Sequence, residues 1–378
     1  MRKSNLVALV AIALLLAACG GPKTTTTQIW GTVTDASGLP APGIRVLLPG
    51  KSIVTTDVNG RFSFDGVTVP YTLIVERESH KFVVYQGIQR TDPQVFTENT
   101  SGIYSTGLQG TVANTTAGNT LGLQLASAHA IGSESMESSA IGTETSYSFP
   151  AFLLQPVTRG TLHALEWSQD ASHNAQDFSG YGVYGDVDLA AGGSISNVDL
   201  DLAPVPGTHD LDVTVEVPSG LDRAYQLAGA RFAGALEYAR PLVTYRDGSP
   251  SSDGYTVRSP DLDAAQMVLA AAASRGANVF SVRWQSVPSS TTAHTLTLRY
   301  PVELLDPPDG AGVAADATFR WNAPSGALSL VYFSGDLDVR VYTAGRETTL
   351  VDLSPFGVSY GSNPYSWSVV TFRLDRIV

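Results

Sequence analysis

Short segments in which apolar and polar residues alternate recur along this chain, and they constrain its fold more than any other feature. Turns rich in Gly, Pro and Asn separate these segments, of which the clearest are Ile29–Asp35, Tyr71–Glu76, Thr161–Trp167 and Leu211–Val217. Alternation with a period of two residues places one face of a strand in a core and the other face in water. The sequence therefore predicts an all-β fold made of tandem antiparallel β-sandwich domains.

The N-terminal segment has a different pattern. Arg2 and Lys3 precede an apolar run that ends in Leu16-Ala17-Ala18, and Cys19, the only cysteine of the chain, follows directly. A charged start, a short apolar run and small residues are typical of a secretory signal. The run is shorter than the roughly 20 residues that span a bilayer. A retained transmembrane anchor, or an ordinary secretory signal with an incidental cysteine, are the alternatives.

Leu16-Ala17-Ala18-Cys19 resembles the bacterial lipobox. The resemblance implies cleavage before Cys19 and several acyl chains on that residue, which together give a stable membrane tether. Gly20, and not Asp, follows the cysteine, and this is similar to lipoproteins sent to the outer membrane. We therefore expect a signal peptide at 1–18, a lipidated cysteine with a linker at 19–27, and a protein of the cell envelope, at the outer membrane or the cell surface.

Length and charge limit the remaining function classes. A chain of 378 residues is long enough for several domains. Its net charge of −12 disfavours binding to nucleic-acid phosphates. Changes in composition and in the spacing of strands and turns suggest domains at 28–98, 99–206, 207–300 and 301–378. The middle two are predicted only to be β-rich.

The first of these domains carries a recognisable motif. Its elements are Gly31-x-Val33-x-Asp35-x-x-Gly38-x-Pro40, then Gly60-x-Phe62-x-Phe64, then Tyr71-x-Leu73-x-Val75. They resemble the carboxypeptidase regulatory-like family, a prealbumin-type β-sandwich of seven strands. The resemblance implies a non-catalytic module with a structural or binding role. Asp57-Val58-Asn59-Gly60 also looks like the start of a calcium loop, but the following residues continue as a strand, which favours a plain turn.

The last domain begins with a proline-rich entry, Leu304 to Gly310, followed by Ala317–Trp321. This is similar to fibronectin type III and immunoglobulin-like modules, in which such an entry leads to a strand with a core Trp. We therefore expect Trp321 in the core of a C-terminal sandwich.

Two segments allow more than one secondary structure. Residues 261–275 carry helix signals, but the same residues with Val279–Trp284 also fit a hairpin, which we favour because the surrounding chain is β throughout. Gly180–Gly185 matches the dinucleotide-binding fingerprint literally. That fingerprint needs a helix after it, whereas Asp186–Leu189 continues as a strand, so we reject a nucleotide site.

The sequence predicts no catalytic residue, no metal site and no cofactor. It lacks a Gly-x-Ser-x-Gly elbow and a phosphate-binding loop. Its six histidines are scattered; His163 and His173 could meet across a hairpin, but their spacing fits no tight metal motif, so surface or loop positions are the default. An enzyme with an unrecognised site in the middle region is the third and least favoured class.

Aromatic residues are the better functional lead. Tyr360, Tyr365 and Trp367 lie in one aromatic-rich turn and could stack on sugar rings, although core or corner positions are the alternative.

The sequence leaves two main hypotheses about function. The favoured one is a non-catalytic, lipid-anchored envelope protein that presents sandwich modules for structural or adhesive protein binding, with the membrane as partner through Cys19. The second is a carbohydrate-binding surface lipoprotein.

Overall fold

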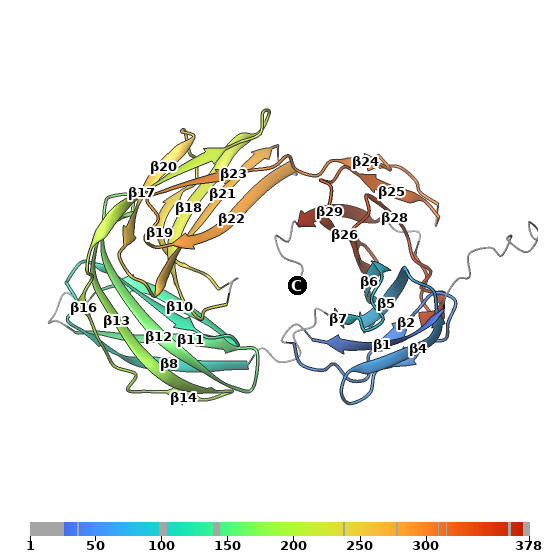
Figure 1. The fold of residues 1–378 in the computed structure, drawn as a ribbon, viewed down its shortest axis with the longest axis horizontal. Helices are drawn as coiled ribbons and strands as arrows, with labels where there is room; N and C mark the ends of the chain where they lie inside the picture. Colours follow the sequence, from blue (N-terminus) through green and yellow to red (C-terminus); the bar gives the residue numbers. More distant parts are fainter. Residues whose placement is uncertain are drawn as a thin grey trace, which may run out of the picture. The chain divides into compact units, whose positions relative to one another are not determined.

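The computed structural model describes residues 26–35, 38–97, 104–138, 144–236, 239–276, 279–308, 310–314, 316–361 and 364–372. These residues form strands β1–β29 and one short 3-10 helix, η1 (Ser354–Phe356), so the predicted all-β fold is confirmed (Figure 1). Contacts divide the chain into two compact units. Unit 1 combines residues 1–99 with 304–378, and unit 2 comprises residues 100–303. The domain boundaries expected from sequence stay predictions.

Seven strands at the N-terminal end of unit 1 form a two-sheet sandwich. One sheet has the order β4-β1-β7, and the other contains β3, β2, β5 and β6. Their bounds are β1 (Thr27–Thr34), β2 (Arg45–Leu47), β3 (Val54–Thr55), β4 (Arg61–Val67), β5 (Tyr71–Glu78), β6 (Lys81–Ile88) and β7 (Gln94–Phe96). Alternate residues of β1 and β4 fill the core, among them Ile29, Val33, Phe62 and Phe64.

Two motif glycines of this sandwich have steric roles. The ring of Phe62 lies directly over Gly31, so a Cβ at position 31 would overlap it. Gly60 has φ of +70°, and a Cβ there would collide with the carbonyl oxygen of Val33. Asp57 accepts hydrogen bonds from the backbone N–H groups of Asn59 and Arg61, each 2.8 Å long, so this segment is the predicted turn.

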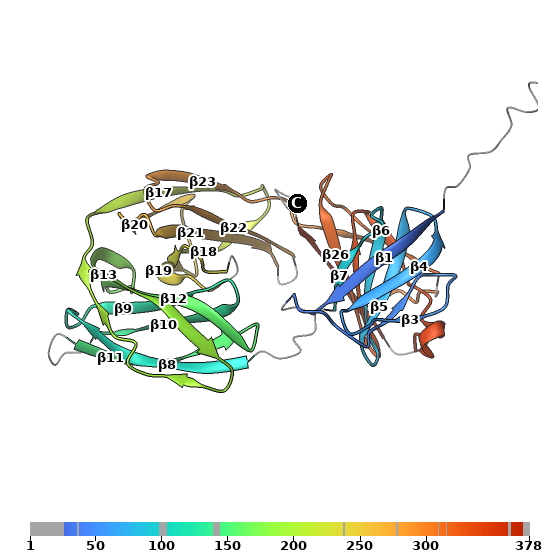
Figure 2. The same cartoon turned by 60° about the horizontal axis from the view of Figure 1, so that its bottom comes forward.

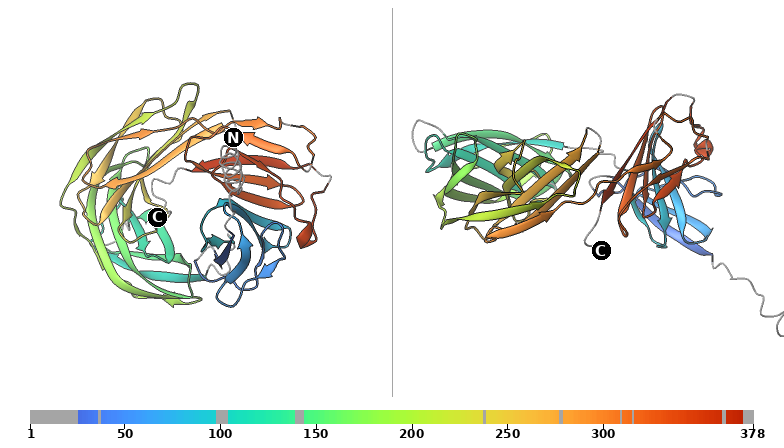
Figure 3. Two further views of the ribbon diagram at one scale, coloured as in Figure 1. Left: turned by 45° about the vertical axis from the view of Figure 1, so that its right-hand side comes forward. Right: turned by 90° about the horizontal axis from the view of Figure 1, so that it is seen from above.

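The C-terminal segment extends the sheet of the N-terminal sandwich. β27 runs parallel to β6, and the resulting seven-stranded sheet has the order β29-β26-β27-β6-β5-β2-β3. Figure 3 shows the blue N-terminal and red C-terminal strands side by side in this unit. A shorter sheet has the order β24-β25-β28. The C-terminal strands are β24 (Leu304–Asp306), β25 (Thr318–Trp321), β26 (Leu328–Ser334), β27 (Asp338–Thr343), β28 (Glu347–Thr349) and β29 (Ser366–Phe372).

Side chains reinforce this join between distant parts of the sequence. The guanidinium of Arg77 pairs with the carboxylate of Asp338 at 2.9 Å, and the rings of Tyr85 and Tyr342 stack at a centroid distance of 5.3 Å. Trp321 is fully buried, as predicted, and its indole N–H donates to Ser329 Oγ at 3.0 Å.

Unit 2 is built in layers, which Figure 2 shows from the side. Its first sheet has the order β14-β8-β11-β10-β9-β12-β13-β16, and β15 pairs with β8. The first two residues of β10 pair with β11, and the rest of β10 pairs with β9. The strands are β8 (Tyr104–Ala113), β9 (Thr120–Ala126), β10 (Ala130–Glu137), β11 (Glu144–Leu153), β12 (Val157–Gln169), β13 (Ala175–Ala190), β14 (Ser194–Ile195), β15 (Leu200–Asp201) and β16 (Ala203–Pro204). The segment Gly180–Gly185 lies inside β13, a strand as expected.

Two further sheets complete unit 2. Their orders are β20-β17-β23 and β19-β18-β21-β22. The strands are β17 (Thr208–Glu216), β18 (Asp222–Phe232), β19 (Leu242–Asp247), β20 (Gly254–Pro260), β21 (Ala265–Arg275), β22 (Val279–Pro288) and β23 (Ala293–Thr297). A single core joins these two sheets to β12 and β13, with Trp167 and Phe178 packed among residues of β17, β18 and β21.

The pairing of β21 with β22 decides the ambiguous segment. The two strands pair antiparallel from Arg275 opposite Val279 to Gln266 opposite Pro288. The predicted hairpin is therefore confirmed. Its alanines serve both faces of β21, because Ala271 and Ala273 enter the core while Ala270 and Ala272 lie on the other face.

Candidate interaction surface

β22 exposes an apolar stripe made of Phe280, Val282 and Trp284. These side chains are 60%, 57% and 47% exposed, and they alternate along the strand, so they lie on one face. Large apolar side chains that gather on one exposed face are typical of binding surfaces, whereas single exposed apolar residues are ordinary.

The polar half of the same strand faces the core instead. Ser281 is only 8% exposed and lies opposite Ala273, which belongs to the core. Its hydroxyl oxygen accepts a hydrogen bond of 3.2 Å from the backbone N–H of Arg299, and this bond offsets part of the cost of burying it. The usual orientation of an alternating strand is therefore reversed in β22.

Small residues flank the apolar stripe on the neighbouring strand. Ala272 lies opposite Val282, and Ala270 lies opposite Trp284. Because directly opposite residues of an antiparallel pair project to the same side, these alanines share the outer face with the stripe. Ala272 is partly exposed and Ala270 is buried, so Phe280, Val282 and Trp284 are the exposed apolar groups of this face.

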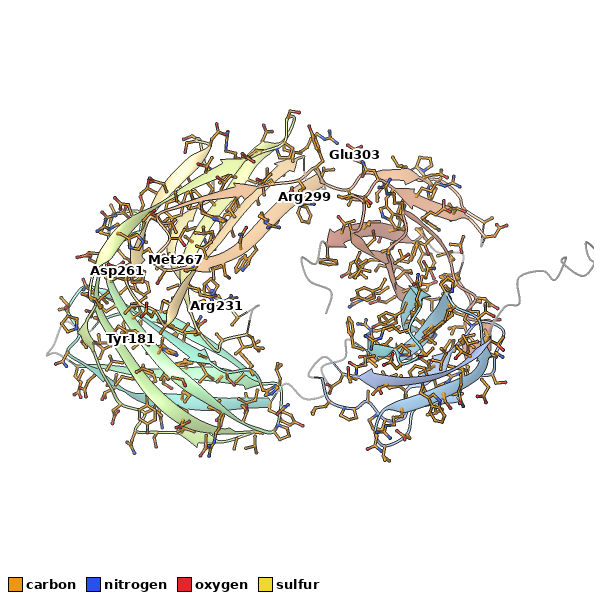
Figure 4. All side chains as sticks on the ribbon, in the orientation of Figure 1. Tyr181, Arg231, Asp261, Met267, Arg299 and Glu303 are labelled. Atoms are coloured by element: carbon orange, nitrogen blue, oxygen red, sulfur yellow. The ribbon has the colours of Figure 1, made fainter. Side chains whose placement is uncertain are left out.

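Polar contacts mark both ends of the stripe, and Figure 4 labels Arg231 and Glu303 at these two ends. Near one end, the buried guanidinium of Arg231 donates to Ser286 Oγ at 2.7 Å and to Gln266 Oε1 at 3.3 Å. Near the other end, Arg275 pairs with Glu303 at 2.9 Å. The stripe is therefore an apolar patch with a polar boundary, which is the usual composition of a protein-binding surface.

The aromatic turn singled out from sequence is packed rather than open. The rings of Tyr360 and Tyr365 meet edge to face at 6.0 Å, and the ring of Trp367 meets that of Phe319 at 5.2 Å. Burial raises the pKa of the Tyr360 hydroxyl, with a further contribution from the neighbouring Tyr365. Glycan contact by these three residues stays a prediction.

The predicted lipidation site, Cys19, and the preceding residues Leu16, Ala17 and Ala18 lie outside the described residues. In the part of the chain that is described, no helix has the length and apolar character needed to cross a bilayer.

The histidine pair considered from sequence does not assemble. His163 lies opposite Val183 within the β12–β13 ladder, whereas His173 is in the turn that joins these strands, with φ of +65°. His163 is buried and stacks on Phe232 at 4.4 Å, so the expectation of surface or loop histidines is wrong for this residue. Burial lowers the pKa of His163 to about 4. Within the described residues, no group of three or more His, Cys, Asp or Glu side chains could hold a metal ion.

A buried carboxylate escaped the sequence analysis. Glu166 is 1% exposed, and its Oε1 accepts hydrogen bonds from the Thr116 backbone N–H at 2.7 Å and from the Ser138 hydroxyl at 2.9 Å. Its Oε2 accepts a bond of 2.7 Å from the Ser179 hydroxyl. These three donors hold two loops onto β12 and β13, which indicates a structural role.

The seven-stranded sandwich at the start of unit 1 can be compared with known families. Residues 28–101 match the family model of the carboxypeptidase regulatory-like domain. The resemblance expected from the glycine and valine motif is confirmed. None of the curated proteins matches the sequence.

Solved structures show remote likenesses to the chain. BcpA, the major pilin subunit of Bacillus cereus, has 8% identity and a TM-score of 0.16, with 72% of this chain and 98% of that chain covered. A proposed cell adhesion protein from Parabacteroides distasonis has 8% identity and a TM-score of 0.20, with coverages of 72% and 98%. The Bacillus anthracis TIE protein has 9% identity and a TM-score of 0.17; the match covers 73% of this chain and about half, 51%, of that one. Scores this low carry no argument about function.

Proposed function

We propose that the chain is a non-catalytic, lipid-anchored envelope protein whose β-sandwich units serve structural or adhesive binding to other proteins. The observation that carries this proposal is the outward apolar stripe of β22. Exposing Phe280, Val282 and Trp284 to water costs free energy of about 25 cal/mol per Å² of apolar surface. A partner protein that covers these side chains would recover this free energy, which favours its binding there.

The module at residues 28–101 supports the non-catalytic part of the proposal, because the family resemblance implies an accessory domain. The join between its β6 and the C-terminal β27 is relevant as well. This ladder pairs Lys81–Tyr85 with Asp338–Tyr342, so segments far apart in the sequence belong to one compact unit.

The sequence Leu16-Ala17-Ala18-Cys19 supports the anchor. Mass spectrometry of the mature protein tests it: we expect Cys19 as the first residue, carrying fatty acyl chains. The variant Cys19→Ser should lose the chains and leave the membrane fraction, while Ser4→Ala in the same segment should behave as the unchanged chain. An unlipidated mature N-terminus would contradict this part of the proposal.

Photo-crosslinking on intact cells tests the binding part. A photoreactive residue placed at position 284 should give a discrete protein adduct. The same residue placed at Thr256, which is exposed on β20 of the same unit, should give none. Equal labelling from both positions, or none from position 284, would remove the support that the stripe gives to an adhesive role.

A further inference from the structure

β22 is the last strand of its sheet. It pairs with β21 along ten positions, and in the described part of the chain no strand pairs with its other edge. The unpaired N–H and C=O groups of such an edge form a template for another strand. The exposed stripe lies on this same strand, so both the backbone and the side chains of β22 are available to a partner.

The stripe is self-complementary. In an antiparallel pair related by a twofold axis perpendicular to the sheet, residues on the axis face themselves. With the axis at Val282, the valine faces Val282 of a second copy, Phe280 faces the copy's Trp284, and Trp284 faces the copy's Phe280. Aromatic pairs facing each other across strands are among the favourable cross-strand contacts. This register brings all three exposed apolar residues of each copy together.

Charge favours the same arrangement. The chain has a net charge of −12, yet it contains no Asp or Glu from Ala264 to Val302. In the register centred on Val282, Arg283 faces Ser281 of the second copy, so no like charges lie opposite each other. Two acidic chains repel least where they lack carboxylates, and β22 is in the middle of such a stretch.

We propose that β22 pairs antiparallel with β22 of a second copy of this chain about a twofold axis at Val282. The pairing joins two four-stranded sheets, each of the order β19-β18-β21-β22, into one continuous sheet. The pairing does not require the lipid anchor, but it rests on the same stripe as the proposed function and names a second copy of the chain as the bound protein. A cross-link to a different protein would exclude the pairing and still support the proposed function, whereas the absence of any cross-link would count against both.

Engineered disulfides test the pairing and its register together. Opposite residues of an antiparallel pair have Cα atoms about 4.5–5.5 Å apart, which a disulfide can bridge. The full chain with Val282→Cys should therefore form a covalent dimer in intact cells under mild oxidation. Phe280→Cys alone should not, because the two copies of this residue would be about 13 Å apart. A mixture of Phe280→Cys and Trp284→Cys chains should cross-link.

Two controls define the background. The unsubstituted chain contains only Cys19, and Val183→Cys places a thiol at another exposed valine of a strand in unit 2. Neither control chain should form the covalent dimer. Equal dimer yields from Val282→Cys and Val183→Cys would overturn the proposal. So would self-linking of Phe280→Cys, or an adduct of Val282→Cys with a protein of another mass.

A charge exchange tests the pairing without thiols. In sedimentation, the purified full chain should shift with concentration from the 39.8 kDa of one chain toward twice that mass. Val282→Asp and Val282→Lys, each alone, should remain monomeric because like charges meet at the axis. Mixed together, they should associate. Association of Val282→Asp alone, or no association in the mixture, would contradict the twofold register.

Discussion

β17 and β22 contribute to the same core of unit 2, and both alternate apolar and polar residues. The apolar residues of β17 face the core, whereas those at the centre of β22 face water. In β17, Leu211 and Val213 are buried while Asp210 and Asp212 are exposed. In β22, Ser281 is buried while Phe280 and Val282 are exposed. The difference teaches that alternation identifies a strand but not its inward face.

The largest expected effect is the difference in the free energy of unfolding between an aspartate at Val213 of β17 and one at Val282 of β22. Val213→Asp puts a carboxylate into the core of unit 2, where Val213 is 2% exposed, and should lower the free energy of unfolding by about 4 kcal/mol or more. Val282→Asp should change it by no more than about 0.5 kcal/mol. Chemical denaturation of dilute protein measures both. Similar losses for the two variants would show that β22 is not reversed.

A second test uses the pH dependence of stability to probe His163, which is buried on β12 and stacks on Phe232 of β18. Burial lowers the pKa of His163 from 6.5 to about 4. Between these values the unfolded chain binds more protons than the folded chain, so the free energy of unfolding falls as the pH falls. The total loss is about 3 kcal/mol.

The variant His163→Gln can still contact the hydroxyl of Tyr181, which lies 2.9 Å from His163 Nδ1. Its unfolding should lack this dependence between pH 6.5 and 4. Denaturation at several pH values compares the two chains. If both show the same slope, His163 does not titrate inside the core.

The smallest expected effect concerns the buried hydroxyl of β22. Ser281→Ala removes the acceptor for the Arg299 backbone N–H and should cost about 1 kcal/mol. Hydrogen exchange at the Arg299 amide should accelerate accordingly. The control Ser146→Ala, at an exposed position of β11, should leave that amide unchanged. Unaltered exchange in Ser281→Ala would mean that the hydroxyl of Ser281 points to solvent.

Local patterns in the sequence were sufficient to predict much of the fold. The alternation in Leu211–Val217, the hairpin that includes Ala265–Arg275 and the core position of Trp321 all depend on neighbouring residues or on a compact motif. The matched domain at 28–101 was likewise visible in its turn glycines and alternating core residues. Such features follow from the geometry of a single strand or turn.

Tertiary features were not predictable in this way. Nothing local indicates that β27 pairs with β6, because parallel pairing of distant segments depends on the whole chain. His163 is buried against Phe232 of β18, and Glu166 is enclosed by the loops that carry Thr116 and Ser138, so both depend on segments far away in the sequence. The reversed orientation of β22 did leave a signal: Phe280, Val282 and Trp284 share one face, and Ser281, Arg283 and Gln285 share the other. Only the second sheet decides which face is covered.

Thiol labelling on β22 tests the central claim most directly. Full-length chains carrying Val282→Cys or Ser281→Cys would be treated with a maleimide in dilute reducing buffer, with the unsubstituted chain as the background for Cys19. The reversed strand predicts rapid labelling at position 282 and slow labelling at position 281 until the chain is denatured. Rapid labelling at 281 with protection at 282 would contradict it.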